Sequence, residues 1–286
     1  MESTPQLSDD QLLVIHDLLL KSPPGELYIV LDEIRALLPG CAIPQEFLEN
    51  AIKEYNLANH VLVDGKDSST HLVLVGSNDD ASNVYYDVLN QRMYTFDHLD
   101  NAVVSEEEFQ DGAVLEEDMK QLRDSLIQKS RMYIKERFSK RSGAYIGVDG
   151  YHIDVILVGE LFRLPSYYTG RWVSHYSLDV VNGSAHLAGS VDINTHYFEN
   201  GNVRMDVHKE LTPASLPLSS ATAASVFAQI AAFEDALQEG LQEVFTSMKQ
   251  DALKDFRHLL PRTRQLFQWN VNAHKMADTM KAMKKQ

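Results

Sequence analysis

Apolar residues recur every three or four positions through the first sixty residues of the chain. This period predicts three amphipathic helices, at about 9–21, 27–38 and 45–57. Ser8 is a plausible N-cap for the first helix, and proline–glycine breaks at 22–25 and 39–40 separate the three. Because the connecting loops are short, we expect residues 1–58 to form a small antiparallel bundle.

The pattern then changes to short runs rich in β-branched and aromatic residues, separated by turns such as Asp64-Gly65. The runs lie at 60–63, 71–75, 84–88 and 93–96. We therefore expect a small β region over 59–114. An acidic, loop-like stretch at 106–118 leads into a predicted helix at about 115–138, within a linking segment 115–140.

A second β region is predicted over 141–216. Its strands are expected at 144–148, 152–158, 168–180, 185–198 and 203–208. Asp149-Gly150 is the strongest short hairpin signal in the chain, and Asn200-Gly201 marks a second hairpin. Consecutive strands without intervening helices predict an antiparallel meander and not alternating βαβ units.

The last quarter of the chain is predicted to be helical. Apolar residues recur in steps of three and four from 219 to 249, which would make one helix about 45 Å long. That is longer than a small sheet needs for cover, so a second polypeptide could share this helix. We assign 217–260 to it, and Pro261 ends it.

A narrow apolar stripe follows in the segment 261–286. It consists of Trp269, Ala273, Met276, Met280 and Met283, with lysines on the other side. The stripe predicts a short helix with too little apolar surface to fold alone. We interpret it as an appendage that docks on a partner, the alternative being a stripe folded back on its own subunit.

These patterns together predict an α+β fold. It has an N-terminal helix bundle, an antiparallel β-sheet crossed by a long C-terminal helix, and then a short amphipathic basic tail helix.

The charge is unevenly distributed. The chain carries 41 acidic and 26 basic residues, for a formal net charge of −15, which argues against nucleic acid as the main partner because phosphate binding needs a basic face. Residues 246–286 carry nine Lys and Arg and three Asp, a net charge of +6, which leaves −21 for the rest. A basic tail on an acidic body indicates a tail that meets an acidic surface, whereas a solvated helix end with a chance bias is the alternative.

Several classes of protein are disfavoured by the sequence. No run approaches the roughly 18 apolar residues of a membrane span, and the N-terminus has neither the basic start nor the apolar stretch of a secretory signal. With the single cysteine Cys41 no intrachain disulfide can form, so we expect a cytosolic location. The eleven histidines show no zinc spacing, and neither a phosphate loop nor a dinucleotide fingerprint occurs. We expect no metal, no cofactor and no enzymatic activity.

Four segments resemble one family. They are Phe96-Asp97-His98-Leu99, Gly170-Arg171-Trp172, the hairpin sequence from His196-Tyr197-Phe198 through Gly201-Asn202-Val203, and Leu260-Pro261-Arg262-Thr263-Arg264 with Trp269-Asn270 beyond it. Weaker similarities occur at Pro23-Pro24-Gly25-Glu26 and at Tyr55-Asn56. In this order and spacing, from about residue 20 to 270, they resemble the alpha subunit of the heterodimeric F-actin-capping protein.

The resemblance implies an obligate heterodimer with a beta subunit, in which strands of both chains join in one antiparallel sheet. It implies a protein that binds the barbed ends of actin filaments and blocks subunit addition and loss, independently of Ca²⁺. The resemblance also implies phosphoinositides and capping regulators as further partners. The implied location is the cytoplasm and the cytoskeleton of the actin-rich cortex.

The resemblance also implies site residues. The actin-binding residues would be Lys254, Arg257, His258, Arg262, Arg264 and Lys275. His258 stands where the family commonly has arginine, and a neutral imidazole near pH 7 would weaken that contact, for which Arg262 could compensate. Any one of these charges could instead be a solvated residue worth under about 1 kcal/mol.

A second set of residues is expected at the interface with the partner. It consists of Arg171, Trp172, Leu237 and Leu241. We expect Arg171 to pair with an acid inside the dimer and Trp172 to be a core or interface anchor.

The competing hypothesis for the function of the chain is an adaptor or scaffold whose basic tail binds anionic lipid or nucleic acid.

Overall fold

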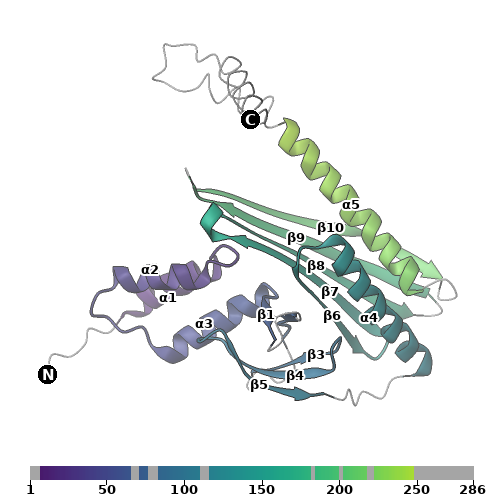
Figure 1. Ribbon diagram of the computed structural model, residues 1–286, viewed down its shortest axis with the longest axis horizontal. Coiled ribbons are helices and arrows are strands. Elements are labelled where there is room, and N and C mark those ends of the chain that lie inside the picture. Colours follow the sequence, from purple (N-terminus) through teal and green to yellow (C-terminus); the bar gives the residue numbers. More distant parts are fainter. Residues whose placement is uncertain are drawn as a thin grey trace, which may run out of the picture. The chain divides into compact units, whose positions relative to one another are not determined.

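The computed structural model describes residues 7–65, 71–76, 83–109, 116–181, 184–199, 202–217 and 222–247 (Figure 1). The chain divides into two compact units, residues 1–234 and 235–286. Each unit is considered by itself below.

The N-terminal residues form three helices, as predicted. They are α1 (Asp9–Leu20), α2 (Leu27–Leu37) and α3 (Gln45–Ala58). Ser8 caps α1 in a reciprocal capping box: its hydroxyl accepts a hydrogen bond from the backbone N–H of Gln11 at 3.3 Å, and its own N–H donates to the Gln11 side chain at 2.9 Å. Buried side chains such as Leu19, Leu31 and Ile52 form the core between the helices.

A small β region follows the bundle. Its strands are β1 (Leu62–Asp64), β2 (His71–Val73), β3 (Val84–Asp87), β4 (Arg92–Asp97) and β5 (Ala102–Glu108). The first two form a hairpin, and the others form a three-stranded sheet in the order β3-β4-β5.

The prediction of a loop from 106 to 118 was wrong at its beginning, because Glu106 to Glu108 belong to the edge strand β5. The acidic sequence concealed the strand. An edge strand with one exposed side can carry charges, and Glu106 lies 3.7 Å from the Arg92 side chain on β4. The predicted helix that follows is present as α4 (Glu117–Arg137).

The main sheet has five strands, each antiparallel to the next, in the order β10-β9-β8-β7-β6. They are β6 (Arg141–Asp149), β7 (His152–Arg163), β8 (Tyr168–Val181), β9 (Ser184–Tyr197) and β10 (Val203–Pro217), with the 3-10 turn η1 (Leu164–Ser166) between β7 and β8. The predicted meander is therefore confirmed, although β10 extends well past the predicted 203–208. Residues 200 and 201 of the second predicted hairpin lie outside the described residues.

The sheet has two different faces. The face that carries Ser174 and Tyr176 packs on α4 and on the first part of α5 (Ala223–Ser247), and we call it the helix face. The opposite face carries Glu160 and Arg171 and contacts the N-terminal helices and the β1–β2 hairpin, and we call it the bundle face. Successive residues of a strand point to opposite faces of the sheet. Alternate residues of one strand therefore contact different parts of the chain: the helices α4 and α5 on the helix face, and the bundle and the β1–β2 hairpin on the bundle face.

Buried Glu234 joins the two helices to the helix face. Its carboxylate accepts hydrogen bonds from Tyr133 of α4 at 2.7 Å, from Ser174 at 2.6 Å and from Tyr176 at 2.9 Å. Burial raises the pKa of Glu234, and the three hydroxyl donors oppose that rise. These hydrogen bonds therefore fix the first part of α5 on the sheet.

His98 joins the bundle to the small β region. Asn56 of α3 lies 3.0 Å from its Nδ1, Tyr85 of β3 lies 2.7 Å from its Nε2, and the hydroxyl of Tyr28 in α2 donates to its carbonyl oxygen at 2.7 Å. Burial lowers the pKa of His98 to about 4 from the ordinary value of 6.5. The folded chain therefore holds this imidazole neutral.

None of the described helices combines the length and the apolar character that a lipid bilayer crossing requires.

The low pKa of His98 predicts that acid destabilises the fold. Because the unfolded chain binds this proton at a higher pH than the folded chain, stability is lost as pH falls from about 6.5 towards 4. We expect His98 to account for a loss of about 2 kcal/mol in the free energy of unfolding between pH 7 and pH 5. Urea unfolding at the two pH values measures it.

The variant His98→Gln should unfold with a shallower pH dependence than the unchanged chain. His186→Gln is the matched control, because His186 is exposed on β9. Equal pH dependence in the unchanged chain and His98→Gln would contradict the neutral, buried imidazole.

Candidate functional site

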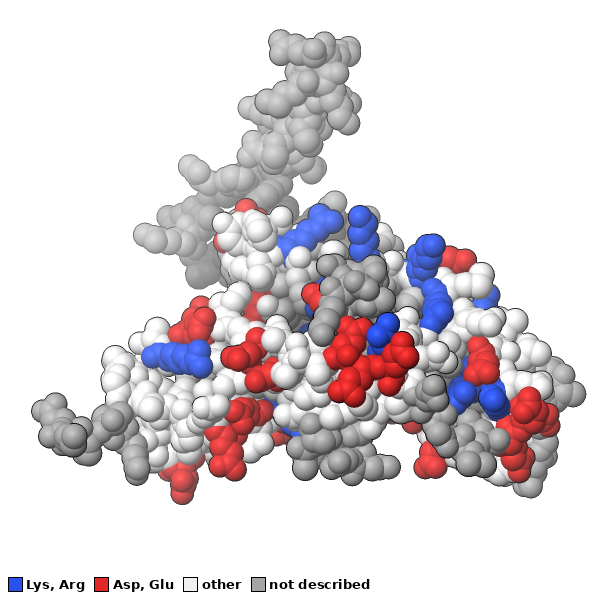
Figure 2. Space-filling model, turned by 60° about the horizontal axis from the view of Figure 1, so that its bottom comes forward, with Lys and Arg blue, Asp and Glu red and all other residues white. Residues whose placement is uncertain are grey.

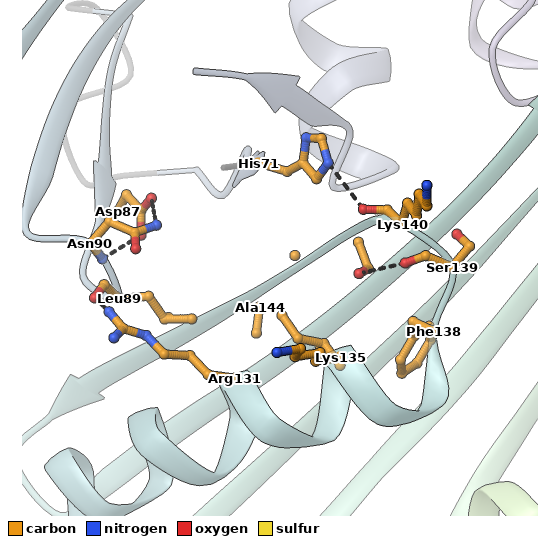
Figure 3. A pocket seen from close by; sticks show the side chains of 13 residues that line it. His71, Asp87, Leu89, Asn90, Arg131, Lys135, Phe138, Ser139, Lys140 and Ala144 are labelled. Carbon is orange, nitrogen blue, oxygen red and sulfur yellow. Dashed lines mark hydrogen bonds between the residues drawn. The ribbon is translucent and has the colours of Figure 1, made fainter. Parts of the chain in front are cut away.

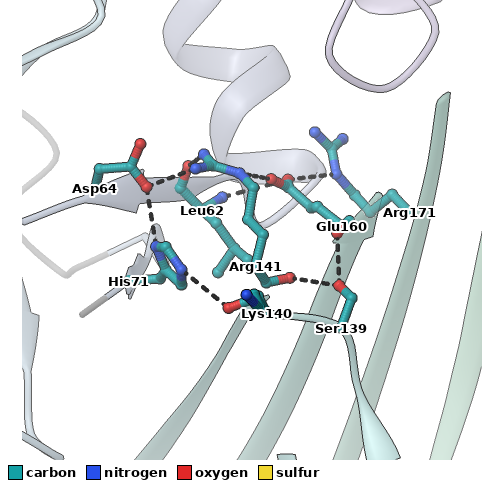
Figure 4. A network of polar contacts seen from close by, with 8 residues as sticks. All are labelled: Leu62, Asp64, His71, Ser139, Lys140, Arg141, Glu160 and Arg171. Carbon is teal, nitrogen blue, oxygen red and sulfur yellow. Dashed lines mark hydrogen bonds and ion pairs between the residues drawn. The ribbon is translucent and has the colours of Figure 1, made fainter. Parts of the chain in front are cut away.

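Glu160 of β7 lies buried between two arginines on the bundle face (Figure 4). Its Oε1 is 3.0 Å from Nε of Arg171, and its Oε2 is 2.8 Å from Nε of Arg141. The side chains of Glu160 and Arg171 are 0% and 2% exposed. A carboxylate this deep is stable as an ion only when it is paired and hydrogen-bonded.

Strand register brings these three residues together. Glu160 pairs directly with Arg141 on β6 and with Arg171 on β8. Residues opposite each other in antiparallel strands share a face, so one row of side chains carries the two charge pairs. The sequence contained a signal for this pair, since Glu160 is the one charge in the apolar run 155–161.

Arg141 extends the network to the β1–β2 hairpin. Its guanidinium donates to the carbonyl oxygen of Leu62 at 2.6 Å and pairs with Asp64 at 2.5 Å. Asp64 also bonds Nδ1 of His71 at 2.9 Å, and Nε2 of His71 lies 3.2 Å from the carbonyl oxygen of Lys140 (Figure 4). The hairpin is thereby fixed to the beginning of β6.

Arg171, which we expected at the interface with a partner, is buried inside its own chain. Its acidic partner is Glu160 of the same chain, and its guanidinium lies 5.9 Å from the ring centre of Tyr55 and 6.0 Å from that of Phe162. Its Nη1 has no hydrogen-bond partner among the described residues. A contact of Arg171 with another chain stays a prediction.

The other predicted interface residues lie elsewhere. Trp172 is half-buried on the helix face, where its indole N–H donates to Ser174 at 2.8 Å and its ring meets Phe138 edge-on at 6.5 Å. Leu237 and Leu241 belong to the α5 residues of the second unit and are partly exposed. Their contacts with a partner also stay predictions.

Glu26 forms a second buried polar contact between the bundle and the sheet, which was not predicted from the sequence. It precedes α2, and its Oε1 lies 2.8 Å from the Thr169 hydroxyl and 2.8 Å from Nδ1 of His196. Gly25 allows this approach, because its φ of 76° is left-handed and a Cβ there would lie 2.8 Å from the Phe162 ring. Two of the segments that carry the resemblance thus contact each other.

The predicted actin-binding residues Lys254, Arg257, His258, Arg262, Arg264 and Lys275 lie outside the described residues. Within the described part, Asp and Glu side chains form several clusters on the face shown in Figure 2. A basic strip on the same chain therefore carries a local charge opposite in sign to that of the acidic body.

Strand β10 is one edge of the main sheet, and none of its 15 residues is buried. No strand of the described residues pairs with its outer edge. A long edge strand with free backbone N–H and C=O groups is a template for pairing with another chain. β10 is therefore the clearest candidate for an assembly surface in the first unit.

Histidine–aspartate pairs cross the bundle face of the sheet. His152 bonds Asp179 at 2.5 Å, and His208 of β10 bonds Asp192 of β9 at 2.7 Å. Hydrogen bonds to these carboxylates raise the pKa of His152 and of His208. Within the described ranges, no group of three or more His, Cys, Asp or Glu side chains could hold a metal ion.

A cavity of about 460 Å³ lies between β2, the β3–β4 turn, α4 and β6 (Figure 3). Its wall includes Arg131, Lys135 and Lys140, with Asp87 as the one carboxylate. Arg131 donates a hydrogen bond to the carbonyl oxygen of Leu89, and Asp87 accepts two from Asn90, so part of this polar wall is satisfied internally (Figure 3).

Removing the Glu160 charge should destabilise the fold strongly. In Glu160→Gln the buried Arg171 loses its counter-charge, and we expect the free energy of unfolding to fall by about 3 kcal/mol or more. Asp64→Asn is the matched control: Asp64 pairs with the same Arg141 but is 57% exposed, so we expect a loss under about 1 kcal/mol. Urea unfolding curves that show equal losses for both variants would refute the role of burial.

Comparison with known proteins places these features in one family. The model of the family described as F-actin capping protein alpha subunit matches residues 15–279. The F-actin-capping protein subunit alpha of Chaetomium thermophilum is 32% identical over 260 residues, which cover 91% of this chain and 91% of that protein. The one from Dictyostelium discoideum is 28% identical over 270 residues, with 92% and 94% covered.

A solved structure shares the fold. It is the homodimeric actin capping protein alpha subunit from Plasmodium berghei, with a TM-score of 0.73 and 18% sequence identity, and the match covers 91% of this chain and 100% of that one. Given the family match across almost the whole length and the relative at 32% identity, this chain belongs to the F-actin capping protein alpha subunit family.

Proposed function

We propose that this chain is the alpha subunit of a capping heterodimer that binds barbed ends of actin filaments with a beta subunit. It blocks subunit addition and loss without Ca²⁺. The observation that carries the proposal is the family match over residues 15–279. Capping needs no bond chemistry, because a protein that covers the terminal actin subunits excludes the next one sterically.

The exposed edge strand β10 supports the heterodimer. A beta subunit that adds a strand there would satisfy the free backbone groups of β10 and continue the antiparallel order of the sheet. Trp172, Leu237 and Leu241 would contribute apolar contacts with the same partner. Arg171 would act indirectly, through its pair with Glu160.

The basic C-terminal segment supports the actin contact. Residues 246–286 carry a net charge of +6 on a chain whose total is −15. A basic strip that faces an acidic filament end accelerates encounter and makes it salt-dependent, while the dissociation rate sets how long growth stays blocked. We place the complex in the cytoplasm and the actin-rich cortex, where phosphoinositides and capping regulators would compete for this strip.

The proposal is tested by elongation of actin from seeds. The chain is co-expressed with a capping protein beta subunit, and the purified complex is added to seeded, pyrene-labelled actin. We expect a one-to-one complex that stops barbed-end growth at the same level with Ca²⁺ and with a chelator. A complex that leaves growth unchanged but binds anionic vesicles or nucleic acid would favour the adaptor.

Neutralising the basic strip should weaken capping and spare the heterodimer. In a variant with alanine at Lys254, Arg257, Arg262, Arg264 and Lys275, we expect dissociation from barbed ends to accelerate by roughly tenfold to a hundredfold. The physical reason is the loss of five attractive contacts, each worth a fraction of a kcal/mol. Single-filament microscopy measures the capped lifetime.

The control variant has alanine at five basic residues of the body. They are Lys21, Arg35, Lys120, Lys135 and Lys140. It changes the net charge by the same amount and should keep the capped lifetime within about twofold. Equal lifetimes for the two variants, or a heterodimer that dissociates in the first, would show that the strip has been misassigned.

A further inference from the structure

The cavity shown in Figure 3 lies at the β6 edge of the main sheet, which is the edge opposite to β10. Four separate parts of the chain form its wall: β2, the β3–β4 turn, the C-terminal half of α4 and the beginning of β6. Its volume of about 460 Å³ falls in the range of pockets that hold small ligands. Three strands separate it from the edge that the proposed heterodimer uses.

Three cations in the wall have no acidic partner. Arg131 and Lys135 lie one helical turn apart on α4, and Lys140 follows the helix just before β6. All three are exposed, and no carboxylate of the described residues forms an ion pair with any of them. The one carboxylate in the wall, Asp87, is buried and accepts hydrogen bonds from the backbone N–H of Asn90 at 3.0 Å and from its side-chain amide at 2.7 Å. The three cations therefore remain available to a ligand.

The sequence around the cavity is locally basic. Residues 129–141 carry six Lys and Arg and one Glu, so their net charge is 6 − 1 = +5, whereas the chain without its basic tail carries −21. One of these cations serves the fold, since Arg141 pairs with buried Glu160. Pairing within the fold does not account for the exposed cations at the cavity, which attract a negatively charged ligand to this part of the acidic body.

The inner wall of the cavity is apolar. Leu89 and Ala144 are buried there, and Ile134 and Phe138 are half-buried. Arg131 donates a hydrogen bond to the carbonyl oxygen of Leu89, which holds its guanidinium at the rim and leaves further N–H donors for a ligand (Figure 3). An apolar group that covers this wall leaves water, so the cavity favours a ligand that combines an apolar group with negative charges.

Separate carboxylates suit this arrangement better than a phosphate group. The cavity lies beside the C-terminal half of α4, where the helix dipole places partial negative charge. Phosphates bind preferentially at helix N-termini, where backbone N–H groups and the positive end of the dipole face the ligand. At this cavity the positive charge is instead carried by long side chains spread from position 131 to position 140, so each cation can meet its own carboxylate.

We propose that this cavity binds an acidic peptide segment of a partner protein. An apolar side chain of the segment covers Leu89 and Phe138, and carboxylates on either side of it pair with Arg131, Lys135 and Lys140. The proposal does not rest on capping, and it uses neither the β10 edge nor the basic tail.

Fluorescence anisotropy tests the site with a defined probe. The full chain, alone or in complex with a capping protein beta subunit, is titrated into a fluorescein-labelled peptide of sequence Asp-Glu-Leu-Asp-Glu-Phe-Asp-Glu. We expect a dissociation constant of about 10–100 µM at low salt, which weakens as the ionic strength rises. A peptide with serine in place of leucine and phenylalanine should bind about fivefold more weakly or worse, because it leaves the apolar wall in contact with water.

Reversing two charges at the rim should remove the site. We expect Lys135→Glu combined with Lys140→Glu to raise the dissociation constant about tenfold or more. Lys21→Glu combined with Lys120→Glu is the matched control, because both lysines are exposed and lie outside the cavity wall. The variant with five alanines in the basic tail is a second control, because that tail is the other basic region that attracts an acidic peptide. Both controls should bind the probe as the unchanged chain does.

Four results would each overturn the proposal. The first is no saturable binding below about 1 mM. The second is a loss of binding in either control as large as in the cavity variant, and the third is equal binding of the serine peptide. The fourth is displacement of the probe by sodium phosphate beyond that by sodium chloride at equal ionic strength, which would identify a phosphate site instead.

Discussion

Burial of the Glu160 carboxylate would cost several kcal/mol if it had no partner, and the rest of this fold is arranged so that it has two. Arg171 and Arg141 reach it from the two neighbouring strands. Arg141 continues to Asp64 and the β1–β2 hairpin, and the Arg171 guanidinium lies against Tyr55 of α3. One row of the sheet therefore holds the helical bundle and the small β region in place.

Two further polar joints have the same character. Glu26 connects the bundle to β8 and β9 through Thr169 and His196, and His98 connects two bundle helices to β3. Three of the four segments that carry the family resemblance supply residues to these joints. The physical explanation is that such contacts need specific side chains at specific distances, whereas an apolar core tolerates substitution. Within the described part of the chain, the short segments that resemble the family thus lie at the buried contacts that hold the fold together.

The exposed surfaces of the chain are less constrained by side-chain packing than these buried contacts are. β10 presents an exposed edge strand, and the acidic body contrasts with the +6 charge of residues 246–286. Association at a strand edge is set by backbone pairing and by the charges that lie opposite. An exposed edge of this kind can therefore accept a strand from a partner chain.

The sequence alone determined the fold class, the three N-terminal helices, the antiparallel meander and the asymmetry of charge, because these follow from local periodicity, turn residues and composition. It did not reveal β5, whose acidic side chains resemble a loop, or that the acid paired with Arg171 is Glu160 of the same chain. Strand register decided the latter: Glu160, Arg141 and Arg171 are up to 30 residues apart in sequence and become neighbours only when β6, β7 and β8 align. Contacts between distant segments depend on this alignment and on the depth of burial, and neither can be read from local sequence.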